Sequence, residues 1–178
     1  KFSMGHFYVA DNGSMADPPR WLGRSREKLA KIQRQLSRME PGSKNYQEAV
    51  QKYRLLHEHI ANQRRDFLHK ESRQIANAWD AVCVRADVLD EMSKALAQVK
   101  DSGYGMFREL LRYKLERQGK PLILVDRYTP TTRTCSACGQ VQDSVDRKLR
   151  TWRCPKCGAV HDREVNAAKN IKSAGLAQ

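Results

Sequence analysis

Two short cysteine motifs are the most informative part of the sequence: Cys135-Ser136-Ala137-Cys138-Gly139 and Cys154-Pro155-Lys156-Cys157-Gly158, with residues 139–153 between the two pairs. A double CxxC at this separation is typical of zinc ribbons, in which each tight turn points two thiolates the same way. The glycines follow where the backbone must fold back toward the sulfurs. We therefore expect Cys135, Cys138, Cys154 and Cys157 to hold one structural Zn²⁺ in a closed tetrahedral shell. A redox pair and an iron–sulfur centre are the alternatives.

The composition around these motifs is strongly basic. The 178 residues carry 33 Lys and Arg against 20 Asp and Glu, a net charge of +13. Such a charge attracts polyanions, and nucleic acid is the leading partner. No apolar run reaches the length of a membrane span, and the start of the chain lacks the apolar core of a signal peptide. We expect one ordinary domain with a small appendage, in a reducing intracellular compartment. Because the sequence opens at Lys1 without Met, we also expect it to be part of a longer protein.

Two helices are predicted in the first half of the chain. Residues 1–10 are typical of a strand that enters a tight turn at residues 11–13. Apolar residues then recur with helical spacing over residues 21–39 and again over residues 46–78. Pro41-Gly42-Ser43 interrupts this pattern, so the two helices should form a long antiparallel hairpin.

The second half predicts a strand–helix–strand unit. Residues 81–84 and 122–125 are short apolar runs typical of buried strands, and residues 104–118 are helical with Gly119 as the stop. This order implies a right-handed parallel crossover. Residues 166–174 predict a final helix, so the cysteine segment is an insertion between the last strand and that helix. The predicted class is α/β with a zinc-bearing insert.

Basic residues line both long helices, the end of the last strand and the cysteine segment. A solvated helix face would explain any one of them, but together they favour contact with a phosphate backbone. The residues that we expect to contact nucleic acid are Arg24, Arg26, Lys31, Arg34, Arg38, Arg64, Arg65, Lys70, Arg127, Arg133, Arg150 and Arg153.

The chain resembles the TnpB-type proteins of bacterial transposons, which are related to the type V CRISPR effectors. The resemblance covers the whole chain, and its motifs are residues 42–45 (GSKN), 64–70 (RRDFLHK), 125–127 (VDR), 134–139 (TCSACG), 152–158 (WRCPKCG) and 161–171 (HDREVNAAKNI). It implies an RNase H-like RuvC domain at residues 1–128 and 159–178, including the helical hairpin 21–78. Residues 129–158 would form the zinc ribbon that binds target nucleic acid. It further implies a guide RNA and target double-stranded DNA as partners, and an RNA-binding and target-binding region before Lys1.

The resemblance also locates three catalytic carboxylates, which in such nucleases converge on two divalent ions. The first position falls on Lys1, the second on Arg85, and the third on Glu164, which keeps a carboxylate one methylene longer than the family's aspartate. A cation facing Mg²⁺ repels it, so we expect no Mg²⁺ binding. Asp162 and Asp87 lie close by in sequence and are the candidates for residual activity.

The leading hypothesis is an RNA-guided DNA-binding protein that has lost its nuclease activity and represses transcription by occupying its target. This resembles the nuclease-dead TnpB-like repressors, and it places the protein in the bacterial cytoplasm on the nucleoid. One alternative is an active metal-dependent endonuclease that uses Glu164, Asp162 and a displaced Asp87. Another is a basic helical scaffold that binds RNA and has no DNA target. The guide, the target, the regulated gene and the oligomeric state have no signal in the sequence.

Overall fold

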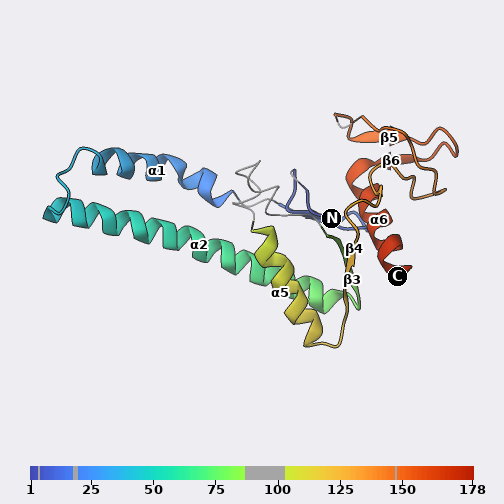
Figure 1. Cartoon of the computed structure of the whole chain (residues 1–178), viewed down its shortest axis with the longest axis horizontal. Helices are drawn as coiled ribbons and strands as arrows, with labels where there is room; N and C mark the ends of the chain where they lie inside the picture. The colour runs from blue at the N-terminus through green and yellow to red at the C-terminus, as the bar shows by residue number, and fades with distance from the viewer. Residues whose placement is uncertain (4, 18–19, 87–102, 147) are drawn as a thin grey trace.

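The computed structural model describes residues 1–3, 5–17, 20–86, 103–146 and 148–178. A two-helix arm extends from a small mixed α/β body, and a cysteine-bearing ribbon lies on the other side of that body (Figure 1). Among the described residues, no helix is long and apolar enough to cross a membrane.

The arm consists of α1 (Trp21–Leu36) and α2 (Lys44–Ala78), which run side by side. Ser43 caps α2 by accepting a hydrogen bond at Oγ from the Tyr46 amide, 3.2 Å away, and Gly42 takes φ +88° in the turn. Apolar side chains close the space between the helices, with the rings of Trp21 and Phe67 5.5 Å apart. The predicted hairpin is confirmed, although α1 ends at Leu36, before the predicted residue 39.

The strands form three separate pairs in the described part of the chain. β1 (Tyr8–Val9) pairs antiparallel with β2 (Met15–Ala16), so the strand expected over residues 1–10 is much shorter than predicted. Residues 1–10 fold back on themselves, because Phe2 makes an isolated antiparallel bridge to Tyr8. β3 (Val82–Arg85) pairs in parallel with β4 (Leu122–Val125), as expected for a crossover. β5 (Thr151–Arg153) pairs antiparallel with β6 (Val160–Asp162) within the ribbon.

The core lies where the β1–β2 hairpin meets α2 and α5 (Tyr104–Glu116). Phe7 is fully buried, and its ring stacks on Tyr104 at 5.2 Å and meets Phe107 edge-on at 4.9 Å. The Tyr104 hydroxyl donates to the Ser3 carbonyl at 2.7 Å, which joins the start of the chain to α5. The hydrogen bond from Tyr104 fixes the backbone at Ser3, and Lys1 is only two residues before Ser3. The aromatic cluster therefore helps to position Lys1.

The last helix, α6 (Arg163–Leu176), packs on β3 and β4. It begins before the predicted residue 166, because Asp162 caps it by accepting hydrogen bonds at Oδ1 from the amides of Glu164 and Val165. Near its other end, a Cβ on Gly175 would lie 2.6 Å from Cys83 Sγ. The close approach of α6 to β3 therefore depends on the absence of a side chain at residue 175.

Candidate metal centre and nucleic-acid interface

The two cysteine motifs adopt the same local fold. In the first, the Gly139 amide donates to the Cys135 carbonyl at 2.9 Å, and in the second the Gly158 amide donates to the Cys154 carbonyl at 2.9 Å. The two glycines take φ values of +74° and +73°, a region that glycine enters at little cost. Each motif is thus a tight knuckle that presents two thiols on one side.

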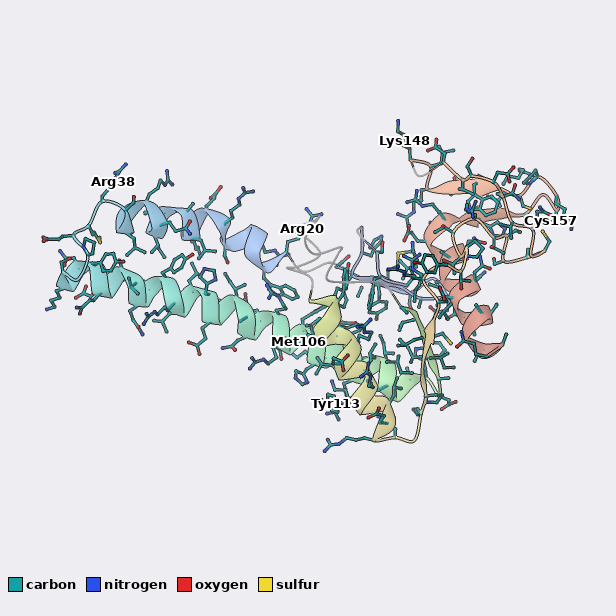
Figure 2. All side chains as sticks on the ribbon, in the orientation of Figure 1. Arg20, Arg38, Met106, Tyr113, Lys148 and Cys157 are labelled. Atoms are coloured by element: carbon teal, nitrogen blue, oxygen red, sulfur yellow. The ribbon has the colours of Figure 1, made fainter. Side chains whose placement is uncertain are left out.

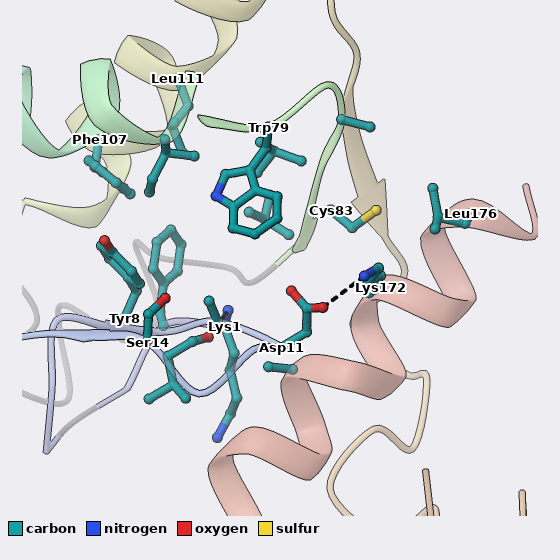
Figure 3. Close-up of a pocket in the computed structure, with 18 of the residues that line it drawn as sticks. Lys1, Tyr8, Asp11, Ser14, Trp79, Cys83, Phe107, Leu111, Lys172 and Leu176 are labelled. Carbon is teal, nitrogen blue, oxygen red and sulfur yellow. Dashed lines mark hydrogen bonds and ion pairs between the residues drawn. The ribbon is translucent and has the colours of Figure 1, made fainter. Parts of the chain in front are cut away.

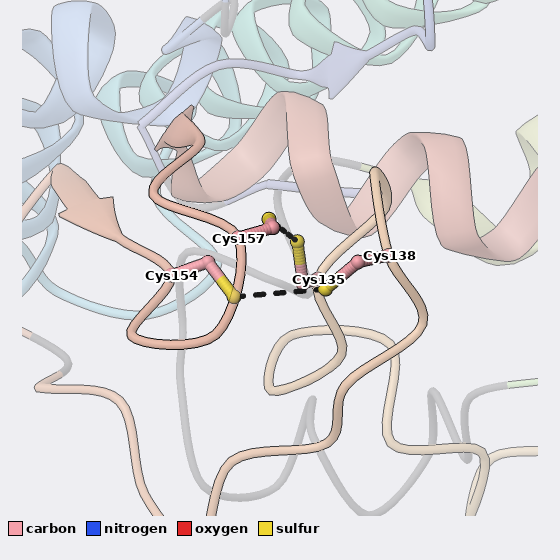
Figure 4. A group of neighbouring side chains, drawn as sticks. All are labelled: Cys135, Cys138, Cys154 and Cys157. Atoms are coloured by element: carbon pink, nitrogen blue, oxygen red, sulfur yellow. Dashed lines mark hydrogen bonds between the residues drawn. The ribbon is translucent and has the colours of Figure 1, made fainter.

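The four thiols face one another across the two knuckles (Figure 4). Cys135 Sγ lies 3.7 Å from Cys157 Sγ, Cys138 Sγ lies 3.7 Å from Cys154 Sγ, and all four sulfurs lie within 4.8 Å of one another. Two sulfur atoms that are each about 2.3 Å from a tetrahedral zinc ion lie about 3.8 Å from one another. The two sulfur atoms of a disulfide bond are only about 2.05 Å apart. The cluster therefore fits a metal such as zinc and leaves no room in the shell for a further ligand.

His161 lies beside this cluster, with Nε2 3.0 Å from Cys135 Sγ. Burial and the charge of Lys169 lower the pKa of His161, which favours the neutral ring. A neutral imidazole protonated at Nε2 donates to the sulfur and disperses part of a thiolate's charge. His161 also packs on Trp152, its strand partner, with the ring centroids 4.9 Å apart. His161 therefore contacts one sulfur of the cysteine cluster from outside the group of four.

Two asparagines of α6 hold the first knuckle. Asn166, which is 1 % exposed, accepts from the Ser136 amide at 2.9 Å and donates to the Thr134 carbonyl at 2.8 Å. Asn170 donates to the carbonyls of Thr131 and Thr134 at 2.8 and 2.6 Å. Buried amides with several partners fix orientation strongly. These residues tie the cysteine cluster to α6, and sequence reasoning did not assign them this role.

Lys1 and Glu164, two of the three positions that the resemblance assigns to carboxylates, lie together. The Lys1 ammonium forms a hydrogen-bonded ion pair with Glu164 Oε2, and both side chains are largely buried at 13 % and 17 % exposure. Arg163 adds a contact to Glu164 Oε1 at 3.3 Å. Burial alone would raise the pKa of Glu164, but the hydrogen bond and charge of Lys1 outweigh it and leave that pKa below its ordinary value. Glu164 is therefore an ionised partner of Lys1.

Asp162, a candidate for residual activity, has structural partners at both oxygens. Oδ1 caps α6, and Oδ2 accepts from Arg150 Nε at 2.8 Å. Burial alone would raise the pKa of Asp162, but the amide of Val165 and the Arg150 guanidinium lower it below its ordinary value. The carboxylate joins the ribbon to α6.

Arg85 ends β3, in register with Val125 of β4. The next amide, of Ala86, donates to the Val125 carbonyl at 2.8 Å, so the parallel pairing continues to this point. Arg85 thus lies at the carboxyl end of the strand pair and is half-buried. Asp87, the other candidate for residual activity, lies outside the described residues.

Most of the basic residues expected to contact nucleic acid are on the surface. Figure 2 shows Arg38, which belongs to this set, near the tip of the arm. Arg64 differs, because it is half-buried and its guanidinium lies over the Trp21 ring, 5.8 Å from the centroid. Lys70 pairs with Asp66 at 2.6 Å. The exposed members are Arg24, Arg26, Lys31, Arg34, Arg38, Arg65, Lys70, Arg127, Arg133, Arg150 and Arg153.

A cavity of about 260 Å³ lies between the β1–β2 hairpin, β3 and α6 (Figure 3). Its lining is mostly apolar and includes Trp79, Cys83 and Phe107. Asp11 and Lys172 form an ion pair of 2.8 Å in its wall. Burial and the charge of Asp11 raise the pKa of the Cys83 thiol, so this cysteine is a poor nucleophile.

Comparisons with known proteins define the class. Residues 2–96 match the OrfB_IS605 family, described as "Probable transposase", and residues 104–171 match the Cas12f1-like TNB domain. The fold is similar to that in the cryo-EM structure of a CRISPR-Cas12f ternary complex, with a TM-score of 0.60 at 18% identity over 89% of this chain and 34% of that one. The molecule is thus an α/β protein whose fold is similar to that of Cas12f and which carries a four-cysteine cluster.

The chain belongs to the TnpB/IS605 transposase family. A protein of Streptomyces pristinaespiralis named "Putative RNA-guided DNA endonuclease" is 36% identical over 93% of this chain and 42% of its own length. Escherichia coli K12 InsQ, which carries the same description, is 31% identical over 93% of this chain and 46% of its own length. The chain therefore spans less than half the length of these relatives.

Proposed function

We propose that this protein is an RNA-guided DNA-binding protein that does not cut its target and acts as a transcriptional repressor by occupying it. The observation that carries the proposal is the Lys1–Glu164 ion pair, which stands where the family resemblance assigns two metal-binding carboxylates. Guide RNA and target double-stranded DNA are the partners, and the nucleoid of the bacterial cytoplasm is the location.

The argument against cleavage is electrostatic. A two-metal nuclease needs several carboxylates to hold its ions and activate water. Here the Lys1 ammonium neutralises Glu164, and Arg85 takes the remaining position. A positive unit charge about 4 Å from a divalent cation is repelled by roughly 8 kcal/mol at an effective dielectric constant of about 20. This is twice the repulsion between two unit charges at the same distance. Because Lys1 cancels the charge of Glu164 and Arg85 supplies a cation in place of a carboxylate, we propose that the site binds no Mg²⁺.

The argument for retained binding rests on the surface charge and the ribbon. Exposed Lys and Arg side chains lie on the arm, and others lie on the ribbon. Their contacts with phosphates are independent of sequence, and base pairing with a guide would supply target choice. We propose that Zn²⁺ fills the four-cysteine cluster and that residues 129–158 form the ribbon, inserted in a RuvC-like domain of residues 1–128 and 159–178 with the helical insertion 21–78. The β5–β6 pairing continues past this boundary to Asp162.

The test uses the complete protein with its co-purified guide RNA, a matched DNA duplex, and Mg²⁺ or Mn²⁺. We expect retention of the duplex in a gel-shift assay with no cut product. Accumulation of cut product would refute the proposal. The matched variant combines Lys1→Asp, Arg85→Glu and Glu164→Asp, and we expect it to gain Mg²⁺-dependent thermal stabilisation that the wild-type protein lacks.

An active endonuclease is the second candidate, and the descriptions of the two relatives favour it. It would use Glu164, Asp162 and Asp87. If cut product appears and Glu164→Ala abolishes it, this candidate replaces the first. A basic RNA-binding scaffold without a DNA target is the third. Sequencing the co-purified nucleic acid distinguishes this scaffold from an RNA-guided protein. Heterogeneous RNA supports the scaffold, and one discrete RNA supports guided binding.

A further inference from the structure

Tyr128 is an exposed aromatic residue that the fold does not use for packing. It lies three residues after the end of β4 and is 77 % exposed, the highest value among the large hydrophobic side chains that the structure describes. Burying an aromatic ring is strongly favourable, so a ring left almost wholly in water is available to a partner.

The backbone under Tyr128 is fixed. Its amide donates to Asp126 Oδ1 at 2.6 Å, and the Thr129 amide donates to the Asp126 carbonyl at 3.1 Å. This local turn follows Val125, which is 1 % exposed and paired with β3. The ring is therefore presented from a rigid support, which lowers the entropy cost of a contact with it.

Arg127 lies against one face of the Tyr128 ring. Its guanidinium lies over Tyr128 at 4.7 Å from the centroid, and it also donates to the Tyr128 hydroxyl. A guanidinium over an aromatic face is a favourable cation–π arrangement that leaves the opposite face for a second planar group. The positive charge beside the ring suits an anionic partner with flat, polarisable groups.

The location suits a nucleic acid strand. Tyr128 is three residues beyond Val125, whose strand partner is Arg85. The turn is therefore at the carboxyl end of the parallel strands, between that edge and the start of the ribbon. A strand that passes this edge would bring a base to the Tyr128 ring, beside the Arg127 guanidinium.

We propose that Tyr128, supported by Arg127, is a stacking platform for an unpaired base of single-stranded nucleic acid. The inference rests on the proposed function as a nucleic-acid-binding protein and adds a contact specific to single strands. A base pair inside a duplex has no free face, so the platform selects a strand that is already open.

The experiment measures binding of the full, zinc-loaded chain to two fluorescent 12-nucleotide DNA strands at one salt concentration. One strand carries thymine bases throughout, and the other carries abasic sites at the same positions. The ratio of the two dissociation constants isolates the contribution of the bases, because the phosphates are identical. Stacking of one base predicts about a 5- to 150-fold preference of the wild-type protein for the strand with bases.

Three variants make the result specific. Tyr128→Ala should bring the ratio close to one without changing affinity for the abasic strand, and Tyr128→Phe should keep the preference. Tyr113→Ala is the matched control, because Tyr113 is also exposed beside a guanidinium but lies on α5. Far-UV circular dichroism and zinc content check that each variant is folded.

The outcomes separate the two proposals. If Tyr128→Ala keeps the wild-type ratio, or if Tyr113→Ala lowers it equally, the platform is wrong while guided binding stands. If the wild-type protein binds both strands equally, the platform is also wrong. If the wild-type protein binds neither strand and its guide complex binds no duplex, the proposed function itself fails.

Discussion

Lys1 and Glu164 form a largely buried ion pair across a separation of 163 positions. The pair joins the start of the chain to the first turn of α6, and the backbone of Lys1 is held by Val9, whose amide donates to the Lys1 carbonyl at 2.9 Å. A cation and a carboxylate thus stabilise each other where the family resemblance assigns two carboxylates around metal ions.

The ion pair should contribute to stability. Lys1→Met leaves the Glu164 carboxylate without its main partner, and we expect a loss of about 1–3 kcal/mol in the free energy of unfolding. Chemical denaturation of Lys1→Met, Glu164→Gln and the double variant gives the coupling energy. Lys172→Met is the control, because it breaks the more exposed Asp11–Lys172 pair and should cost less than 1 kcal/mol. A coupling energy near zero for Lys1 and Glu164 would contradict the prediction.

The same pair predicts a pH dependence. The folded-state pKa of Glu164 is below its ordinary value of 4.5, so its stabilising contribution is complete above about pH 4.5 and is lost as the pH falls through the folded pKa. Thermal melts of the wild-type protein should therefore lose stability on acidification over this window more steeply than melts of Lys1→Met. Parallel curves for the two proteins would show that Lys1 does not lower that pKa.

The cysteine cluster should hold one zinc ion per chain and should depend on it for order. Removal of zinc by a chelator leaves four thiols without a common partner, and a structural zinc contributes on the order of 10 kcal/mol to folding. Cys154→Ser should abolish stoichiometric zinc, measured by mass spectrometry of metals, whereas Cys83→Ser should keep it because Cys83 lies on β3 outside the cluster. Full zinc content in Cys154→Ser would refute the assignment.

His161 should strengthen zinc retention without being a ligand. Loss of a group that hydrogen-bonds a ligand typically weakens metal affinity by about 10- to 100-fold. We expect His161→Ala to lose zinc to a competing chelator in that range while it still binds one ion, and His69→Ala, on the exposed surface of α2, to behave as wild type. A stoichiometry below one at saturating zinc would contradict this supporting role.

Gly175 should tolerate no side chain. A Cβ there would lie 2.6 Å from Cys83 Sγ and 2.9 Å from Cys83 Cβ, so Gly175→Ala should cost about 1–3 kcal/mol by overpacking. Gly23→Ala is the matched helical control, because its Cβ would meet only the Arg20 Cβ at 3.6 Å, and it should stabilise α1 by up to about 1 kcal/mol. Equal melting temperatures for both variants would show that α6 can move away from β3.

Local patterns in the sequence predicted a large part of the fold. The periodic apolar residues of α1 and α2, the break at residues 41–43, the parallel β3–β4 pair with α5 between its strands, and the glycines that follow each CxxC depend on neighbouring residues and backbone preferences. They could therefore be predicted without knowledge of the packing. The ends of α1 and α6 were less accurate, because caps such as Asp162 depend on side-chain contacts.

Short-range patterns of apolar period, turn residues and spacing were enough to predict the helices, the parallel strand pair and the pairing of four cysteines in two short motifs. Other relationships became visible only in the folded chain: Lys1 pairs with Glu164, Asp162 caps α6 and pairs with Arg150, the Arg64 guanidinium lies over Trp21, and Tyr128 is exposed. The physical reason is that these relationships depend on how separate elements pack. Burial and partners at long range determine whether a charged or aromatic side chain is structural or available to a ligand.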